Sequence, residues 1–187
     1  VLFAGSATRS AGISRALPAA QIFVHPGFRP DPSDFELFDM SNDVALLKLA
    51  TPYDLTVGTI EPIALPVDQD PAAWPPLGSP GQITGWGDTD PDVSPSLPNI
   101  LQKATIDVLS PPTSFKCGSY TNIYDPVSML CAGLPQGGIG TCYGDSGGPL
   151  AIKGVLAGIT SWVGECAGVN DPAVFTKVTR YVDWIVP

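Results

Sequence analysis

The chain has 187 residues, of which 44% are hydrophobic and 14% charged, and its formal net charge is −9. This length and composition describe a folded globular protein with a substantial core, and they exclude a disordered chain. The negative charge argues against nucleic acid and against anionic lipid as partners, because both attract a basic surface. No apolar run approaches the roughly 18 residues of a membrane-spanning helix.

The 20 glycines and 21 prolines predict many turns between short strands. The four cysteines contain no C-x-x-C pair, so zinc ligation is disfavoured. Two disulfides require an oxidising compartment, and we therefore expect a secreted or periplasmic protein. Four cysteines allow three pairings, and their spacing does not choose between them. We expect no metal ion and no cofactor.

The first thirty residues carry short apolar runs at 1–3 and 22–24, which predict strands on either side of a flexible connection. They contain no acidic residue, so they offer no carboxylate ligands to a hard cation such as calcium. His25, the single histidine of the chain, directly follows the second run. It is either a candidate general base or an ordinary residue at the end of a strand.

Residues 29–42 form a polar loop interrupted by prolines. Its acidic residues could border a substrate cleft or form a solvated cluster, and they are Asp31, Asp34, Glu36 and Asp39. The loop leads into Asp43 and the mostly apolar residues 44–49, which predict a buried strand. Asp43 is therefore either a turn or cap residue or a carboxylate with a chemical role.

Residues 50–78 hold six prolines, a density that predicts an extended connection between two units. Strands are expected again at 82–87 and 101–109. Close to the C-terminus, residues 171–178 predict a further strand, and the apolar spacing within 181–185 predicts one turn of amphipathic helix.

Residues 140–149 read Gly-Thr-Cys-Tyr-Gly-Asp-Ser-Gly-Gly-Pro. A serine that acts as a nucleophile needs a neighbouring base and fixed donors for the oxyanion, and flanking glycines allow a sharp turn and the close approach of a carbonyl group. The same residues are ordinary turn formers, so a surface loop is the alternative. The string also fits the G-x-S-x-G motif of α/β-hydrolases, but that fold requires a histidine after the serine. No histidine follows Ser146.

Residues 144–149, with Cys142 before them and the apolar run 150–152 after them, resemble the nucleophile segment of chymotrypsin-like serine proteases. Residues 42–49 and 82–87 resemble further segments of that family. The resemblance implies an all-β fold with two antiparallel six-stranded Greek-key barrels, the first one incomplete, and a short C-terminal helix. It implies four regions, which are the remainder of the N-terminal barrel at 1–65, a Pro-rich interdomain connection at 66–80, the C-terminal barrel at 81–178 and the C-terminal helix at 179–187.

The resemblance also implies roles for individual residues. It makes Ser146 the nucleophile, Asp43 the carboxylate that orients the imidazole, and the N–H groups of Gly144 and Ser146 the oxyanion hole. The template of this mechanism places the histidine about 45 residues before the aspartate. That position lies just before Val1, whereas His25 lies only 18 residues before Asp43. We therefore expect His25 to be a surface residue at a strand end and the catalytic histidine to be absent from these residues.

With that histidine, the N-terminal quarter of the enzyme is expected to be missing. It would include the terminal ammonium that in this family pairs with the aspartate before the nucleophile, here Asp145. A chain without the base and without that partner is expected to be inactive and poorly folded by itself. The competing hypothesis is a non-catalytic binding protein on the same fold. Such relatives usually lose triad members, and the presence of Asp43 and Ser146 counts against it.

The resemblance places the floor of the primary specificity pocket at Gly140, where trypsin-like enzymes hold an aspartate that pairs with Lys or Arg. Val163 and Ala173 stand where chymotrypsin-like pockets have glycines. This narrower slot resembles that of elastases, so we expect cleavage after Ala, Val or Leu, graded by the roughly 1–3 kcal/mol that one methylene is worth. The residues expected to bind substrate are Gly140, Thr141, Ser161, Trp162, Val163 and Ala173.

Among the three possible disulfide pairings, the resemblance favours Cys117 with Cys131 and Cys142 with Cys166. The function that it implies is that of a serine endopeptidase, which hydrolyses peptide bonds through an acyl-enzyme. The expected partners are protein or peptide substrates and protein inhibitors of proteases.

Overall fold

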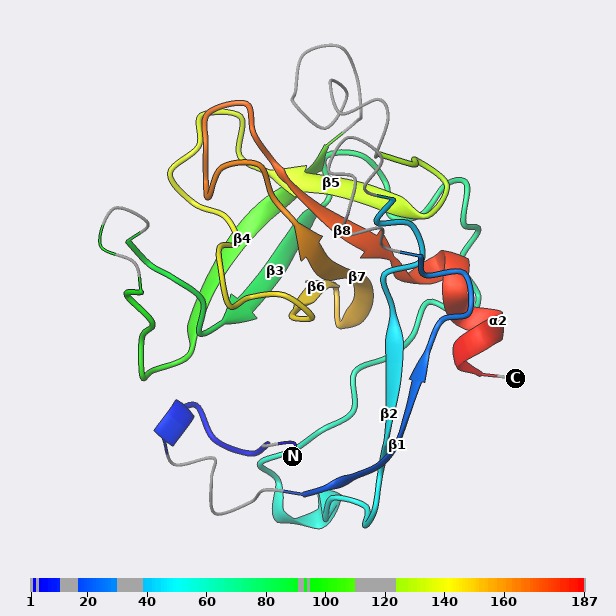
Figure 1. Ribbon diagram of the computed structural model, residues 1–187. Coiled ribbons are helices and arrows are strands. Elements are labelled where there is room, and N and C mark those ends of the chain that lie inside the picture. The colour runs from blue at the N-terminus through cyan, green and yellow to red at the C-terminus, as the bar shows by residue number, and fades with distance from the viewer. Residues whose placement is uncertain are drawn as a thin grey trace.

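The computed structural model describes residues 2, 4–10, 17–29, 39–90, 93, 95–109 and 124–186. Their strands form two units, a two-stranded antiparallel sheet and a closed barrel (Figure 1). The sheet pairs β1 (Ala19–Val24) with β2 (Ala45–Leu49). The barrel has the order β3-β4-β5-β8-β7-β6. Its strands are β3 (Pro80–Gly85), β4 (Gln102–Leu109), β5 (Met129–Gly133), β6 (Pro149–Ile152), β7 (Val155–Trp162) and β8 (Ala173–Lys177).

Short helices complete the described part of the chain. The 3₁₀ helix η2 (Leu55–Val57) follows β2, and a second one, η4 (Val178–Tyr181), leads into α2 (Val182–Ile185) beside the β1–β2 sheet (Figure 1). The expected all-β class, with a barrel and a short C-terminal helix, is confirmed. Three barrel strands overlap the ranges expected from the sequence, which are 82–87, 101–109 and 171–178. No described helix is long and apolar enough to span a membrane.

Alternation of side chains builds the interior of the barrel. On β4, Ile106 and Val108 are buried and Thr105 is exposed, since successive side chains of a strand point to opposite faces. Phe175 on β8 and Leu150 on β6 are fully buried in the same cluster. Because β3 pairs with both β4 and β6, the sheet closes on itself and keeps this cluster from water. Burying one side chain of this size stabilises the fold by about 1.5–3 kcal/mol.

The β1–β2 sheet is covered far less. Ile22 is 62% exposed and Leu47 45%. The strand expected after Asp43 is present as β2, but the prediction that it is buried is wrong, because only Val44, directly before it, is buried. The physical reason is that β1 and β2 form an open two-stranded sheet among the described residues, which encloses no interior like that of the closed barrel.

The strand expected at residues 1–3 is represented by an isolated bridge between Leu2 and Leu17, while Val1 and Phe3 lie outside the described residues. The N-terminal part of the chain meets the barrel at other points. Thr8 forms an antiparallel bridge with Ile100, and Ala64 forms a parallel bridge with Val155 at the start of β7. These bridges help to hold the sheet and its flanking segments against the barrel.

Candidate active site

Ser146 lies in an exposed turn that leads into β6. Backbone hydrogen bonds fix this turn, because Gly148 N–H donates to the Asp145 carbonyl at 2.9 Å and Gly147 N–H donates to the Thr160 carbonyl of β7 at 2.8 Å. Gly147 has a φ of 79°, a left-handed conformation that glycine adopts without steric cost. The local sequence therefore presents the serine on a tight turn anchored to the barrel.

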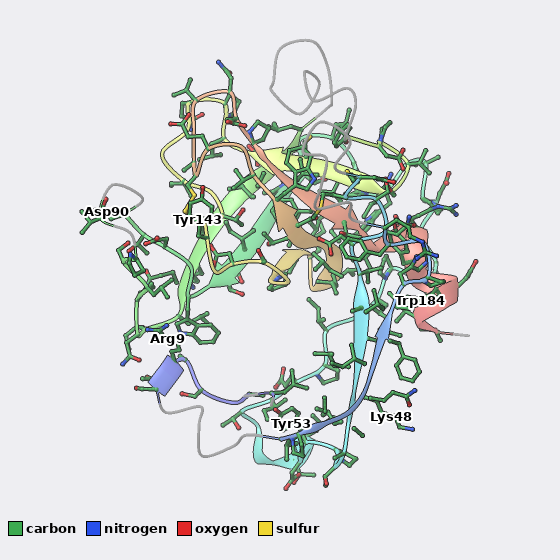
Figure 2. The ribbon with its side chains drawn as sticks, in the orientation of Figure 1. Arg9, Lys48, Tyr53, Asp90, Tyr143 and Trp184 are labelled. Carbon is green, nitrogen blue, oxygen red and sulfur yellow. A yellow bond between two sulfur atoms is a disulfide. The ribbon has the colours of Figure 1, made fainter. Side chains whose placement is uncertain are left out.

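The expected oxyanion donors are the N–H groups of Gly144 and Ser146. Both residues are exposed, and Gly144 has a φ of 95°, which a residue with a side chain rarely adopts. Within the described part of the chain, neither N–H group donates a hydrogen bond. Both donors are therefore free to meet the oxygen of a bound carbonyl group. The neighbouring Tyr143 lies on the barrel side of the molecule, 66% exposed (Figure 2).

Two backbone N–H groups hold the carboxylate of Asp145. Its Oδ1 accepts a hydrogen bond from Gly87 N–H at 2.9 Å, and its Oδ2 accepts one from Cys142 N–H at 3.0 Å. A Cβ atom at Gly85 or at Gly87 would overlap this carboxyl group. Gly85 at the end of β3 and Gly87 after it thus make room for Asp145, which explains why the Gly-Trp-Gly sequence stands at this place.

Two hydroxyl groups of the barrel hold Asp43. Ser161 Oγ on β7 donates to Asp43 Oδ2 at 2.6 Å, and Thr176 Oγ1 on β8 donates to the Asp43 carbonyl at 2.7 Å. Ser161 directly follows Thr160, whose carbonyl receives Gly147 N–H from the nucleophile turn. Ser161 and Thr160 are adjacent on β7, and they bind Asp43 and the turn of Ser146, respectively.

Ser161 was expected in the specificity pocket, and its contact with Asp43 was not predicted from the sequence. The contact of Thr176 with Asp43 was not predicted either. The only sequence signal for these roles is the occurrence of hydroxyl side chains within otherwise apolar strands, and such residues are common where no site exists. Their contacts join segments more than 100 residues apart, which no local pattern reveals.

His25 lies directly after β1, as expected, and it is half-buried. Its backbone N–H donates to the Val44 carbonyl at 3.0 Å, and its Nδ1 accepts a hydrogen bond from Gly27 N–H at 3.1 Å. Its ring meets those of Tyr181 and Trp184 edge-on, with centroids 5.2 and 5.0 Å away. These contacts fix His25 against the C-terminal helices, and no contact among the described residues joins it to the serine.

The residues expected to form the specificity pocket surround a cavity of about 10 Å³. Four of the six line it, namely Gly140, Thr141, Val163 and Ala173. Ser161 and Trp162, the last two residues of β7, do not line it. Its volume is near the roughly 10–15 Å³ that a single water molecule needs. The Thr141 hydroxyl oxygen is buried without a hydrogen-bond partner among the described residues. Asp171, which the sequence analysis did not single out, is buried and lines the same cavity.

A second cavity, of about 530 Å³, lies behind the nucleophile turn. Thr141, Cys142 and Asp145 line one part of it, and Asp88 and Lys103 line another. The sequence analysis did not predict a cavity at this place. It is much larger than the specificity pocket, and the two share the wall that Gly140 and Thr141 form.

A disulfide joins Cys142 to Cys166, the pairing that the resemblance implied, with a Cα–Cα distance of 4.9 Å. Cys131 is disulfide-bonded as well. Cys117, its expected partner, lies outside the described residues, so that pairing stays a prediction. The bond between Cys142 and Cys166 ties the segment before the serine to the segment after Val163, and both segments line the specificity pocket.

Two further expectations concern carboxylates. The acidic loop stays untested, because Asp31, Asp34 and Glu36 lie outside the described residues. Asp39, the last acid of that loop, accepts a hydrogen bond from Ser41 N–H at 2.8 Å. Among the described residues, no group of three His, Cys, Asp or Glu side chains could hold a metal ion.

Comparisons with known proteins agree with this arrangement. The family model described as Trypsin matches residues 2–185. Kallikrein 1-related peptidase b27 of Mus musculus is 44% identical over 148 residues, which are 79% of this chain and 52% of the relative. Trypsin-1 of Astacus astacus is 36% identical over 178 residues, 93% of this chain and 68% of the relative. The chain thus spans about half to two thirds of the length of these relatives.

A solved structure gives the same result in three dimensions. Neuropsin, described as a serine protease expressed in the limbic system of mouse brain, superposes with a TM-score of 0.78 at 33% sequence identity. The superposition covers 97% of this chain and 75% of neuropsin. The similarity therefore extends over nearly the whole chain, including both the sheet that carries the aspartate and the barrel that carries the serine.

Proposed function

The chain belongs to the trypsin family of serine proteases, and on that premise we propose that it carries the nucleophile, the orienting aspartate and the specificity pocket of a serine endopeptidase. The observation that carries the proposal is the arrangement around β7. Ser161 binds the carboxylate of Asp43, and the preceding Thr160 binds the turn of Ser146. If the segment around Ser146 were only a structural turn, nothing would require Asp43, which comes from outside the barrel, to be fixed by the neighbouring Ser161.

In the proposed reaction, Ser146 Oγ attacks the carbonyl carbon of the substrate while an imidazole takes the hydroxyl proton. The carbonyl oxygen becomes an oxyanion and accepts hydrogen bonds from the N–H groups of Gly144 and Ser146. The imidazolium then gives its proton to the leaving amine, and water hydrolyses the acyl-enzyme by the same steps. Asp43 orients the imidazole and stabilises its charged form. Residues 161–163 would pair with the substrate as a β-strand.

We propose that the imidazole comes from a residue outside these 187. His25 is the single histidine of the sequence, and its ring and Nδ1 are engaged with Tyr181, Trp184 and Gly27. We therefore propose the activity for the polypeptide that also supplies the base, and we expect the 187-residue chain by itself to be inactive. A binding protein without catalysis on the same fold is the alternative outcome of the tests below.

Substrates with small aliphatic residues before the cut fit the pocket best. Gly140 provides no carboxylate at the expected floor, and Val163 and Ala173 narrow the walls around a cavity of about 10 Å³. Because one methylene contributes only about 1–3 kcal/mol of discrimination, the preference for Ala, Val and Leu should be graded rather than absolute. The buried Asp171 lines the same cavity, and a carboxylate could pair with a basic side chain. Hydrolysis of substrates with Lys or Arg before the cut should therefore be compared with that of substrates with Ala or Val.

The location and partners follow from the same features. Disulfide-bonded cysteines at Cys142, Cys166 and Cys131 support a secreted or periplasmic location. The partners proposed are protein or peptide substrates, together with protein inhibitors that occupy the pocket in the same extended conformation.

Labelling with a fluorophosphonate tests the catalytic part of this proposal. The natural protease should be modified stoichiometrically at Ser146, as mass spectrometry of its peptides would show, and Ser146→Ala should abolish the modification. The 187-residue chain should remain unlabelled. A folded natural protein that leaves Ser146 unmodified would favour the non-catalytic alternative, and labelling of the 187-residue chain would contradict our placement of the base.

The specificity is tested with peptide anilides that differ only in the residue before the cut. We expect the highest kcat/KM for Ala and Val, and we expect Val163→Gly to shift the preference toward larger residues. Ala173→Gly is the matched variant on the opposite wall and should act in the same direction. The highest efficiency on Lys, Arg or Phe would refute the small-residue pocket while leaving the proposed endopeptidase activity intact.

A further inference from the structure

The residue before Asp43 has an unusual conformation and a fully engaged side chain. Asn42 has a φ of 62°, in the left-handed region that asparagine tolerates better than most residues. Its Nδ2 donates to the Gly27 carbonyl at 3.2 Å, and its Oδ1 accepts a hydrogen bond from the Tyr181 hydroxyl at 3.2 Å. One amide group therefore connects the turn after β1 with the 3₁₀ helix η4.

Tyr181 is a firm anchor for this amide. Its side chain is 3% exposed, and its ring packs against His25, which also contacts Trp184 on α2. Burial raises the pKa of the Tyr181 hydroxyl above its ordinary value, so this group keeps its proton and remains a donor at neutral pH. His25 N–H in turn binds the carbonyl of Val44. The residues on both sides of Asp43 are thus held by one aromatic cluster.

The barrel holds Asp43 from a different direction. Ser161 and Thr176 bind its carboxylate and its carbonyl. The preceding peptide is held on its other side, because the Asn42 carbonyl accepts a hydrogen bond from Val44 N–H at 2.8 Å and the Asn42 side-chain amide connects this turn to Gly27 and Tyr181. A displacement of about 1 Å in a catalytic group can cost on the order of 100-fold in rate, so the backbone at this turn matters for a carboxylate that must orient an imidazole.

We propose that Tyr181 and Asn42 are positioning residues of the proposed protease site, and that the hydrogen bond between them sets the backbone turn that aims the carboxylate of Asp43. This inference rests on the proposed function. The two residues touch neither the substrate nor the reacting atoms, so they act on the chemical step through Asp43. Loss of their hydrogen bond should lower kcat and leave KM nearly unchanged.

The central experiment compares two variants that each remove one tyrosine hydroxyl from the natural, active protease. Tyr181→Phe keeps the ring against His25 and removes the donor to Asn42. We expect kcat to fall about 3- to 10-fold, as for the loss of one hydrogen bond, with KM within about twofold of wild type. The control is Tyr124→Phe, which removes a hydroxyl that donates to the Met129 carbonyl at 3.4 Å and makes no contact with Asp43 among the described residues. It should leave both constants unchanged.

A second variant shows whether Tyr181 acts through Asn42. Asn42→Gly accepts the same positive φ and removes both amide hydrogen bonds, so kcat should fall at least as far as in Tyr181→Phe. In that background Tyr181→Phe should cause a smaller loss than in the wild type, because the hydrogen bond to Asn42 is already gone and the one that remains involves the Ser128 side chain. Additive losses, or equal losses in Tyr181→Phe and Tyr124→Phe, would overturn the proposal and indicate a general effect on stability.

The inference can be separated from the proposed function by a measurement that needs no activity. The carboxyl ¹³C resonance of Asp43 reports its surroundings in the folded protein. We expect it to move in Tyr181→Phe and to stay in place in Tyr124→Phe. If the wild-type protein never hydrolyses a peptide, the proposed function fails, and this resonance still decides the positioning. An unmoved Asp43 resonance in Tyr181→Phe would overturn it.

Discussion

The barrel strand β5 and the sheet strand β1 are both short and rich in apolar residues, yet their surroundings differ. Every residue of β5 is buried, whereas five of the six residues of β1 are exposed. β5 lies between β4 and β8 in a closed ring, and β1 has β2 as its single partner among the described residues. β5 is buried because it belongs to a closed ring of strands. A similar apolar composition does not bury β1, which lies in an open sheet.

The proposed active site draws on both units. Ser146 lies in the turn before β6 of the barrel, whose interior is complete, and Asp43 lies two residues before β2 of the exposed sheet. Asp43 itself is bound to the barrel by hydrogen bonds from hydroxyl groups, and the nearby Met40 packs against a buried cluster of the barrel. The position of the serine therefore depends on the barrel core, while the position of the aspartate depends on polar contacts and on the packing of a neighbouring side chain.

The largest expected effect tests this contrast directly. Phe175 is fully buried in the barrel, so Phe175→Ala should lower the free energy of unfolding by about 3–5 kcal/mol, from lost burial and the cavity left behind. Phe23 on β1 is 41% exposed, and Phe23→Ala should cost less than about 1 kcal/mol. Urea denaturation measures both. Similar losses at the two positions would show that the sheet is packed as tightly as the barrel.

A smaller effect is expected where the barrel supports the nucleophile turn. A Cβ atom at Gly87 would overlap the carboxyl group of Asp145, so Gly87→Ala should destabilise the protein by about 1–3 kcal/mol and reduce fluorophosphonate labelling of Ser146. Gly154→Ala is the control, because a Cβ atom there meets open space and only the positive φ costs energy, about 1 kcal/mol. It should leave the labelling unchanged, and reduced labelling in both variants would contradict a specific role of Gly87.

The smallest effect concerns alkaline pH and the half-buried Tyr124, which packs against a buried cluster of the barrel. Burial, followed by the charge of Asp125, raises the pKa of Tyr124 to about 12. Because the folded-state pKa lies above the unfolded value of about 10, the stability that this group contributes is complete below pH 10 and is lost as the pH rises to 12. Tyr124→Phe should therefore flatten the decline of unfolding free energy between pH 10 and 12. An unchanged decline would mean that Tyr124 is not buried in solution.

Much of the fold followed from short patterns in the sequence. The glycines around Ser146 indicated a tight turn, and the apolar runs indicated strands that the structure contains at β3, β4 and β8. The exposure of β2 could not be foreseen, because an apolar run does not reveal how many partners its strand has. Asp171 and Thr176 were missed for a related reason. Their roles arise from contacts between distant segments, and nothing in their local sequence differs from ordinary strand residues.

The disulfide between Cys142 and Cys166 keeps the molecule in one piece when a peptide bond between these two cysteines is hydrolysed. It closes a covalent ring that contains both Ser146 and Val163, and the exposed tip of the β6–β7 hairpin at Lys153 and Gly154 lies within the same ring. Hydrolysis of the bond between these two residues would add one water to the mass and create two new chain ends. The fragments would separate on a gel only after reduction. A nicked molecule would thus keep Ser146 and Val163 in one covalent unit.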